Sequence, residues 1–247
     1  MIDWHKQSIH SFVFCLFIVM MSCTSSAQKI EDDRFVLHVI NLETQNLKFY
    51  YQNETGNNFG NFKTLRHSLL DQNEELVFAM NGGMYLKDGS PQGLFIENGI
   101  TKKEIDTTKE AYGNFYLQPN GVFYLTKAKK GIVCKTQDFK TNSNIIYATQ
   151  SGPMLVIDGE IHPVFVKDSK NLHIRNGVGV LQNGDLLFAM SKDLISLYDF
   201  AAFFKSHGCK NALYLDGFVS RTYFPRKKWE QLDGSFGVII GETKNLN

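Results

Sequence analysis

Short apolar runs separated by polar, glycine-containing turns make up most of the chain after residue 34. Runs of this length, rich in Val, Ile, Leu and Phe, are typical of strands; examples are 35–40, 47–51, 76–80, 154–157, 178–181 and 212–215. Three turns carry Asn-Gly or Asp-Gly, at 98–99, 158–159 and 183–184, and this pair is the strongest local signal of a β-hairpin. We also expect hairpins between 35–40 and 47–51, and between 114–117 and 122–125.

Two segments have helical spacing instead. Leucines at 65, 69 and 70 predict a short helix over residues 64–72. Apolar residues at 197, 200, 201 and 204 follow the i, i+3, i+4, i+7 pattern, with an N-cap expected at 191–193 and Gly208 as the C-terminal cap. Mostly antiparallel strands with hairpins and about two main helices define an α+β fold, and we expect a single domain over residues 35–243.

The first 22 residues have the pattern of an export signal. Lys6 provides a positive flank, and the apolar run from Ser8 to Met21 is too short for a comfortable membrane span. The run ends in a small residue before Cys23, which resembles a bacterial lipoprotein cleavage site with Cys23 as the lipid-bearing residue; ordinary cleavage after Ala27 is the alternative. Both predict export to the periplasm or outer envelope. With the lipoprotein site, residues 23–34 form a linker and the chain contacts the membrane only through the lipid.

Composition narrows the class of partner. The chain has 247 residues, 43% of them hydrophobic, and a net charge of +1, which argues against non-specific nucleic-acid binding. Cys134 and Cys209 could pair in an oxidising compartment or stay as separate thiols. No spacing of Cys or His suggests zinc, and no cofactor is expected, although a hard cation held by Asp216 and backbone carbonyls stays open.

Four polar segments, each containing glycine, adjoin apolar strands. They are Asn81-Gly82-Gly83, Ser151-Gly152-Pro153, Arg175-Asn176-Gly177, and Asp216-Gly217 with Ser220 and Arg221. Together they offer one carboxylate, two guanidiniums, amides, hydroxyls and flexible backbone. Arginine binds phosphate oxygens in pairs, and amides and carboxylates bind sugar hydroxyls, so this set suits a sugar that bears a phosphate.

These four segments, with Met84-Tyr85 after the first and Met154-Leu155-Val156 after the second, resemble in order the motifs of the phosphodiester glycosidase family, whose animal member is the mannose-6-phosphate uncovering enzyme. The resemblance covers roughly residues 35–241. It implies an exported hydrolase that cleaves the bond between a sugar's C1 and the oxygen of a phosphodiester. By this resemblance Asp216 is the key carboxylate, and Arg175 binds phosphate. The substrate-binding set is Asn81, Gly82, Gly83, Tyr85, Ser151, Gly152, Asn176, Gly217, Ser220 and Arg221.

The chain departs from the family after Asp216, where only Gly217 of a glycine-rich signature is kept and bulky Phe218 follows. This departure supports an alternative, a non-catalytic envelope protein that binds an anionic or phosphorylated glycan in the same cavity. Hydrolysis at the P–O bond is a third, weaker hypothesis. A second carboxylate is usual in glycosidases, and the candidates in the sequence are Asp88, Glu97 and Glu160.

Overall fold

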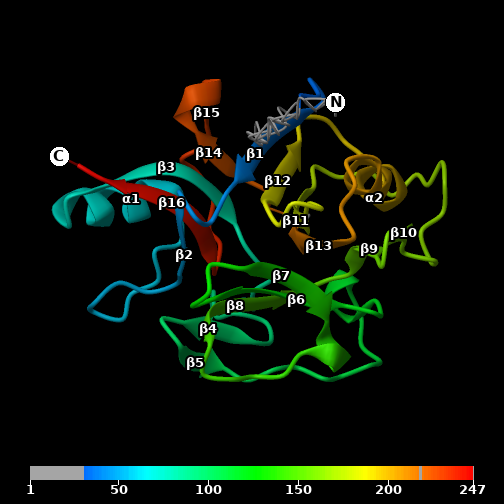
Figure 1. The fold of residues 1–247 in the computed structure, drawn as a ribbon, viewed down its shortest axis with the longest axis horizontal. Coiled ribbons are helices and arrows are strands. Elements are labelled where there is room, and N and C mark those ends of the chain that lie inside the picture. The colour runs from blue at the N-terminus through cyan, green and yellow to red at the C-terminus, as the bar shows by residue number, and fades with distance from the viewer. Residues whose placement is uncertain (1–30, 217–218, 247) are drawn as a thin grey trace, which may run out of the picture.

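The computed structural model describes residues 31–216 and 219–246, and these residues form three antiparallel sheets and two α-helices (Figure 1). The predicted export signal, Cys23, Gly217 and Phe218 lie outside the described residues. In the first sheet the strand order is β1 (Phe35–Ile40), β12 (Leu186–Ser191), β11 (Asn176–Val180), β13 (Asn211–Asp216), β9 (Met154–Ile157) and β10 (Glu160–Ile161).

The other two sheets have five strands each. The second sheet has the order β15 (Trp229–Glu230), β14 (Thr222–Phe224), β3 (Glu74–Asn81), β16 (Ile239–Asn245) and β2 (Asn46–Tyr50). The third has the order β5 (Ile100–Lys103), β4 (Phe95–Glu97), β8 (Ile145–Ser151), β6 (Gly121–Thr126) and β7 (Gly131–Lys135). Short 3₁₀ turns lie at Asn114–Tyr116, Thr136–Asp138 and Pro225–Lys227.

One hydrophobic core joins the three sheets. Phe188 from the first sheet, Phe78 from the second and Phe123 from the third belong to a single buried cluster, and each of these side chains is 0% exposed. The rings contact one another directly, with centroids 5.5 Å apart for Phe78 and Phe188 and 5.9 Å apart for Phe123 and Phe188. The chain therefore folds as the single α+β domain expected from its pattern, because the sheets share one core.

Each helix covers the outer face of one sheet. α2 (Leu197–Ser206) packs Phe200 and Phe204 onto the first sheet, and α1 (Phe62–Asp71) packs Phe62 and Leu65 beside β3 and β16 of the second (Figure 1). Among the described residues, no helix is long and apolar enough to cross a membrane.

The N-cap of α2 differs from the prediction. Ser196 caps the helix by accepting a hydrogen bond from the backbone N–H of Asp199, whereas Ser191, in the predicted 191–193 segment, ends β12. Gly208, with φ of +78°, follows the helix at the position expected for the C-terminal cap. Ser196 followed three residues later by Asp199 is a stronger capping signal than residues 191–193, and the sequence analysis did not use it.

The three hairpins with Asn-Gly or Asp-Gly turns are confirmed, since β4 pairs with β5, β9 with β10, and β11 with β12. Two other predicted hairpins are wrong. β1 pairs with β12 and β2 with β16, so the five residues between β1 and β2 carry the chain from one sheet to another. Residues 114–116 form a 3₁₀ turn, and β6 pairs with β7 instead. The first wrong hairpin had no two-residue turn signal. The second was predicted around Pro119-Asn120-Gly121, but Gly121 is the first residue of β6 and pairs with Lys135, so this Asn-Gly pair does not form a hairpin turn.

Candidate functional site

Strand ends from all three sheets meet at one place. β3 ends at Asn81, β8 at Ser151 and β13 at Asp216, while β11 begins at Asn176. The hydroxyl of Ser151 donates a hydrogen bond to the backbone carbonyl of Leu215 at 2.8 Å, which ties the third sheet to the first. The four segments singled out in the sequence are therefore brought together, although they are far apart along the chain.

A β-bulge sets the position of Asp216. The register between β11 and β13 pairs Asn176 with Asp216 and Gly177 with Tyr214, so Leu215 is an extra residue in β13. Bulges turn a side chain away from the regular alternation of a strand and are frequent beside active sites. The backbone N–H of Asp216 donates to Asn176 Oδ1 at 2.8 Å, which closes the irregular register with a side chain.

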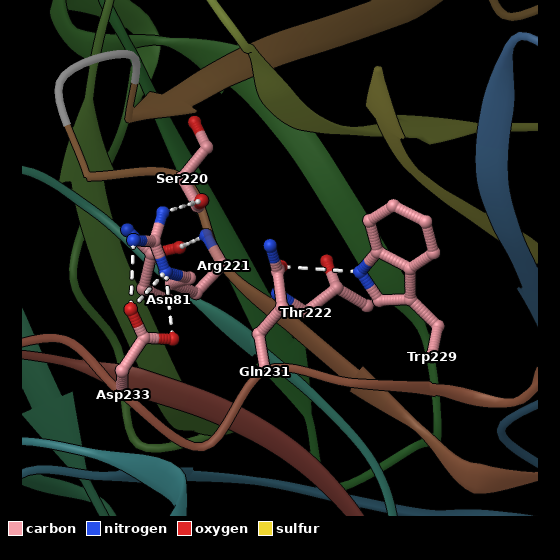
Figure 2. A network of polar contacts seen from close by, with 7 residues as sticks. All are labelled: Asn81, Ser220, Arg221, Thr222, Trp229, Gln231 and Asp233. Carbon is pink, nitrogen blue, oxygen red and sulfur yellow. Dashed lines mark hydrogen bonds and ion pairs between the residues drawn. The ribbon is translucent and has the colours of Figure 1, made fainter. Parts of the chain in front are cut away.

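One buried amide holds the Asp216 carboxylate, and a second amide orients the first. Asn81 Nδ2 donates to Asp216 Oδ2 at 2.8 Å. Asn81 Oδ1 accepts from Asn176 Nδ2 at 2.9 Å and from the backbone N–H of Arg221 at 2.8 Å, the latter visible in Figure 2. Because the Asn81 oxygen is occupied by two donors, its NH₂ group must face the carboxylate. Asn81 and Asn176 are both 0% exposed, so this orientation is protected from water.

Asp216 lines a cleft of about 440 Å³. The other lining residues are Met84, Tyr85, Leu86, Lys87, Gln92, Asn114 and Val219. Burial raises the pKa of Tyr85, and the negative charge of Asp216 raises it further, which places the phenol within electrostatic reach of the carboxylate. Tyr85 Oη donates to the backbone carbonyl of Ser235 at 2.7 Å, so the ring has a fixed position in the wall.

Arg175 lies next to this cluster but is sealed in the protein. Its side chain is 0% exposed, and it donates to the backbone carbonyl of Ile195 at 2.8 Å and to Tyr214 Oη at 2.8 Å. A third nitrogen donates to Asn171 through both the backbone carbonyl, at 2.9 Å, and Oδ1, at 3.1 Å. The guanidinium also lies 5.3 Å from the centre of the Tyr214 ring. A phosphate could reach Arg175 only if these hydrogen bonds were exchanged.

Ser220 and Arg221 are also engaged within the protein. Ser220 contacts backbone carbonyls, and Arg221 contacts an exposed carboxylate (Figure 2). Ser220 Oγ lies 2.6 Å from the Asp216 carbonyl and 3.1 Å from that of Ile174, so Ser220 contacts both the end of β13 and the segment that precedes β11. Arg221 Nε and Nη2 pair with the exposed carboxylate of Asp233, at 3.1 Å and 2.9 Å, and Nη1 donates to the Ser220 carbonyl.

The predicted glycines allow close approach of backbone. The N–H of Gly82 donates to the carbonyl of Val238 at 2.9 Å. Gly83 has φ of +94°, and a Cβ at this position would clash with Thr149 Oγ1. A Cβ on Gly152 would meet the side chain of Asn120 at 2.5 Å. These contacts explain why glycine is needed where the second and third sheets converge, and none of the three glycines lines the cleft.

The three candidates for a second carboxylate lie elsewhere. Asp88 accepts hydrogen bonds from Ser90, and Glu160 pairs with Lys205 at 2.6 Å. Glu97 lines a separate cavity of about 550 Å³ that shares no lining residue with the Asp216 cleft. Among the described residues that line the cleft, Asp216 is therefore the one carboxylate.

Several lining residues escaped the sequence analysis. Met84 belongs to the first family motif but was not predicted to bind substrate, and Val219 adjoins Ser220, so proximity to the motifs could have indicated both. Lys87 and Gln92 follow within a few residues of the first segment, but nothing in the local pattern distinguishes them. Asn114 begins the 3₁₀ turn Asn114–Tyr116, far from the other lining residues in sequence, and only tertiary structure could place it in the cleft. Within residues 31–216 and 219–246, no group of three or more Cys, His, Asp or Glu side chains could hold a metal ion.

Comparison with known proteins gives the class to which this fold and site belong. The family model described as phosphodiester glycosidase matches residues 74–236, which include Asn81, Arg175 and Asp216. The chain is also 37% identical over 187 residues to uncharacterized protein YigE of Escherichia coli (strain K12), covering 75% of this chain and 72% of that protein. The chain therefore belongs to the phosphodiester glycosidase family.

Solved structures support the fold. The catalytic domain of zebrafish N-acetylglucosamine-1-phosphodiester alpha-N-acetylglucosaminidase, in a form auto-inhibited by its pro-peptide, superposes with a TM-score of 0.55 at 12% identity, over 87% of this chain and 85% of that chain. A hypothetical protein from Synechocystis gives a TM-score of 0.52 at 15% identity, over 85% of this chain and 59% of that chain. The shared architecture is thus established at identities too low to transfer residue roles.

Proposed function

We propose that this protein hydrolyses a glycosyl phosphodiester, breaking the bond between the sugar's C1 and the phosphate oxygen. The observation that carries this proposal is the placement of Asp216, whose carboxylate is held by Asn81 at 2.8 Å and lines an open cleft of about 440 Å³. Membership of the phosphodiester glycosidase family supports the reaction class. The name of the zebrafish neighbour suggests an N-acetylglucosamine 1-phosphodiester as the first substrate to test.

Asp216 acts at the anomeric carbon in this proposal. As C1–O cleavage proceeds, positive charge gathers on the sugar ring, and a carboxylate beside C1 stabilises it. The carboxylate either attacks C1 itself or removes a proton from the attacking water. If Asp216 attacks C1, water then displaces it from C1 and the electron pair of that bond returns to the carboxylate. In both cases the oxygen of water ends on C1, the electron pair of the broken C1–O bond stays on the phosphate oxygen, and the proton of water passes to solvent, through Asp216 when it acts as the base.

A single carboxylate is sufficient because of the leaving group. The departing species is a phosphomonoester, whose second pKa is about 6. It can leave as an anion near neutral pH without a general acid, whereas an ordinary alcohol leaving group needs a second carboxylic acid. This agrees with a cleft whose described lining has one carboxylate.

The test uses N-acetylglucosamine 1-(methyl phosphate) in water enriched in heavy oxygen. We expect free N-acetylglucosamine carrying the label and unlabelled methyl phosphate. Label in the phosphate would instead show cleavage at the P–O bond and a phosphodiesterase. Binding of the diester without release of sugar would favour the non-catalytic glycan-binding protein.

The stereochemistry of the released sugar separates the two roles of Asp216. The α-linked diester is used, because its 2-acetamido group is cis to the phosphate and cannot displace it. Retention of the anomeric configuration, followed by NMR at early times, then indicates that Asp216 is the nucleophile. Inversion indicates that it is the base for water.

We also propose that the chain is exported and anchored through a lipid on Cys23. The support is the sequence pattern of residues 1–23. Growth with a labelled fatty acid should label the native chain, and Cys23→Ser should abolish the label. Labelling that persists in the variant would contradict the anchor site.

A further inference from the structure

Arg175, which was expected to bind phosphate, and Arg221, which was expected to bind substrate, are both occupied within the protein. Arg175 is 0% exposed and donates to Ile195, Tyr214 and Asn171. Arg221 is paired with the carboxylate of Asp233. A phosphate in the cleft therefore needs a different cation.

Lys87 is the one cation among the described residues that line the Asp216 cleft. It is exposed, and none of the ion pairs found among the described residues includes it. An ammonium group in this position can turn toward an anion in the cleft without first losing a protein partner. The carboxamide-bearing residues Gln92 and Asn114 line the same cleft and can supply further hydrogen-bond donors.

The turn that carries Lys87 is well ordered by local hydrogen bonds. The backbone N–H of Leu86 donates to the Ser90 carbonyl at 2.8 Å, and that of Gly89 donates to the Leu86 carbonyl at 2.9 Å. Asp88 Oδ1 accepts from both the N–H and the hydroxyl of Ser90, at 2.9 Å and 2.7 Å. Little backbone ordering is therefore required when Lys87 meets a ligand, which favours binding.

We propose that Lys87 binds the phosphate of the diester. The proposal rests on the function proposed above. A phosphodiester carries one negative charge at neutral pH, and the ammonium group of Lys87 is the one positive charge among the described residues that line the cleft.

The experiment measures binding separately from turnover. Asp216→Asn is the parent, so that the substrate stays intact, and Lys87→Gln and Lys87→Arg are added to it. The matched control is Lys63→Gln, which removes the same charge from an exposed position on α1. The probes are N-acetylglucosamine 1-(methyl phosphate) and the uncharged methyl N-acetylglucosaminide, titrated by calorimetry at two salt concentrations.

We expect Lys87→Gln to raise the Kd for the diester about tenfold, since a charge-assisted contact is lost, and to leave the neutral glycoside unchanged. Lys87→Arg should restore most of the affinity, and the salt dependence of diester binding should weaken in Lys87→Gln alone. In the chain with Asp216 intact, Lys87→Gln should raise KM and largely preserve kcat.

A Kd for the diester that stays within twofold of the parent would overturn the proposal. So would equal weakening for the neutral glycoside, or a parent that binds no diester. If the native chain binds the diester but releases no sugar, the glycosidase function fails, while the same Kd comparison still decides the role of Lys87.

Discussion

Asp216 and Arg175 are both buried charged residues at the start or end of neighbouring strands, yet their surroundings differ. Asp216 is held by amides and lines the cleft, whereas Arg175 is enclosed by carbonyls, a phenol and an aromatic ring. The difference separates two uses of a buried charge. A charged group that lines a cleft can act on a ligand there, whereas a charged group that is 0% exposed and bound by protein groups on several sides mainly stabilises the fold.

The largest expected effect is on catalysis. Asp216→Asn keeps the shape of the side chain and can still accept a hydrogen bond from Asn81, so the fold should be retained. Loss of the charge at the anomeric carbon should lower kcat about a thousandfold. The matched control is Asp233→Asn, which removes a carboxylate from an exposed position outside the cleft. Full activity in Asp216→Asn would show that the reacting carboxylate lies elsewhere.

Arg175→Ala should act chiefly on stability. Truncation removes the guanidinium donors to the Asn171 carbonyl and the Tyr214 hydroxyl, leaves the Ile195 carbonyl with the backbone N–H of His173, and opens a cavity. We expect the free energy of unfolding in urea to fall by about 3 kcal/mol. Arg226→Ala, at an exposed position, should change it little. A stable Arg175→Ala chain with a raised KM for the diester would instead support direct phosphate binding.

Asn176→Ala tests the link between the two regions, because Asn176 follows Arg175 and holds Asp216. It removes the acceptor for the Asp216 N–H and the donor to the Asn81 oxygens. We expect a loss of about 2 kcal/mol in stability. Displacement of the carboxylate should also lower kcat up to about a hundredfold. Stability lost with kcat unchanged would mean that Asn81 alone positions Asp216.

The smallest effect is expected for Arg221→Ala. Its partner Asp233 is largely exposed, and surface ion pairs contribute less than about 1 kcal/mol. The backbone N–H that Arg221 gives to Asn81 is unchanged by the substitution. Thermal unfolding and the KM for the diester should therefore stay close to those of the native chain. A marked rise in KM would show that the ion pair opens to bind substrate.

The sequence was informative wherever local chemistry decides structure. Asn98-Gly99, Asp158-Gly159 and Asn183-Gly184 each predicted a hairpin correctly, since the backbone twist of a two-residue turn is a local property. The pairing of β1 with β12, separated by some 150 residues of chain, has no local signal. Strand alternation indicates which face is buried but not which strand lies alongside.

The order of the four polar segments was likewise sufficient to indicate the family and to single out Asp216 as the candidate carboxylate. Which of those residues line the cleft was decided only by tertiary structure. The sequence shows that Arg175 and Lys87 both carry a positive charge. It does not show that Arg175 is enclosed between Ile195 and Tyr214, or that Lys87 lines the cleft. The residue types determine which chemical groups are available. The packing of three sheets around one core determines which of these groups can contact a ligand.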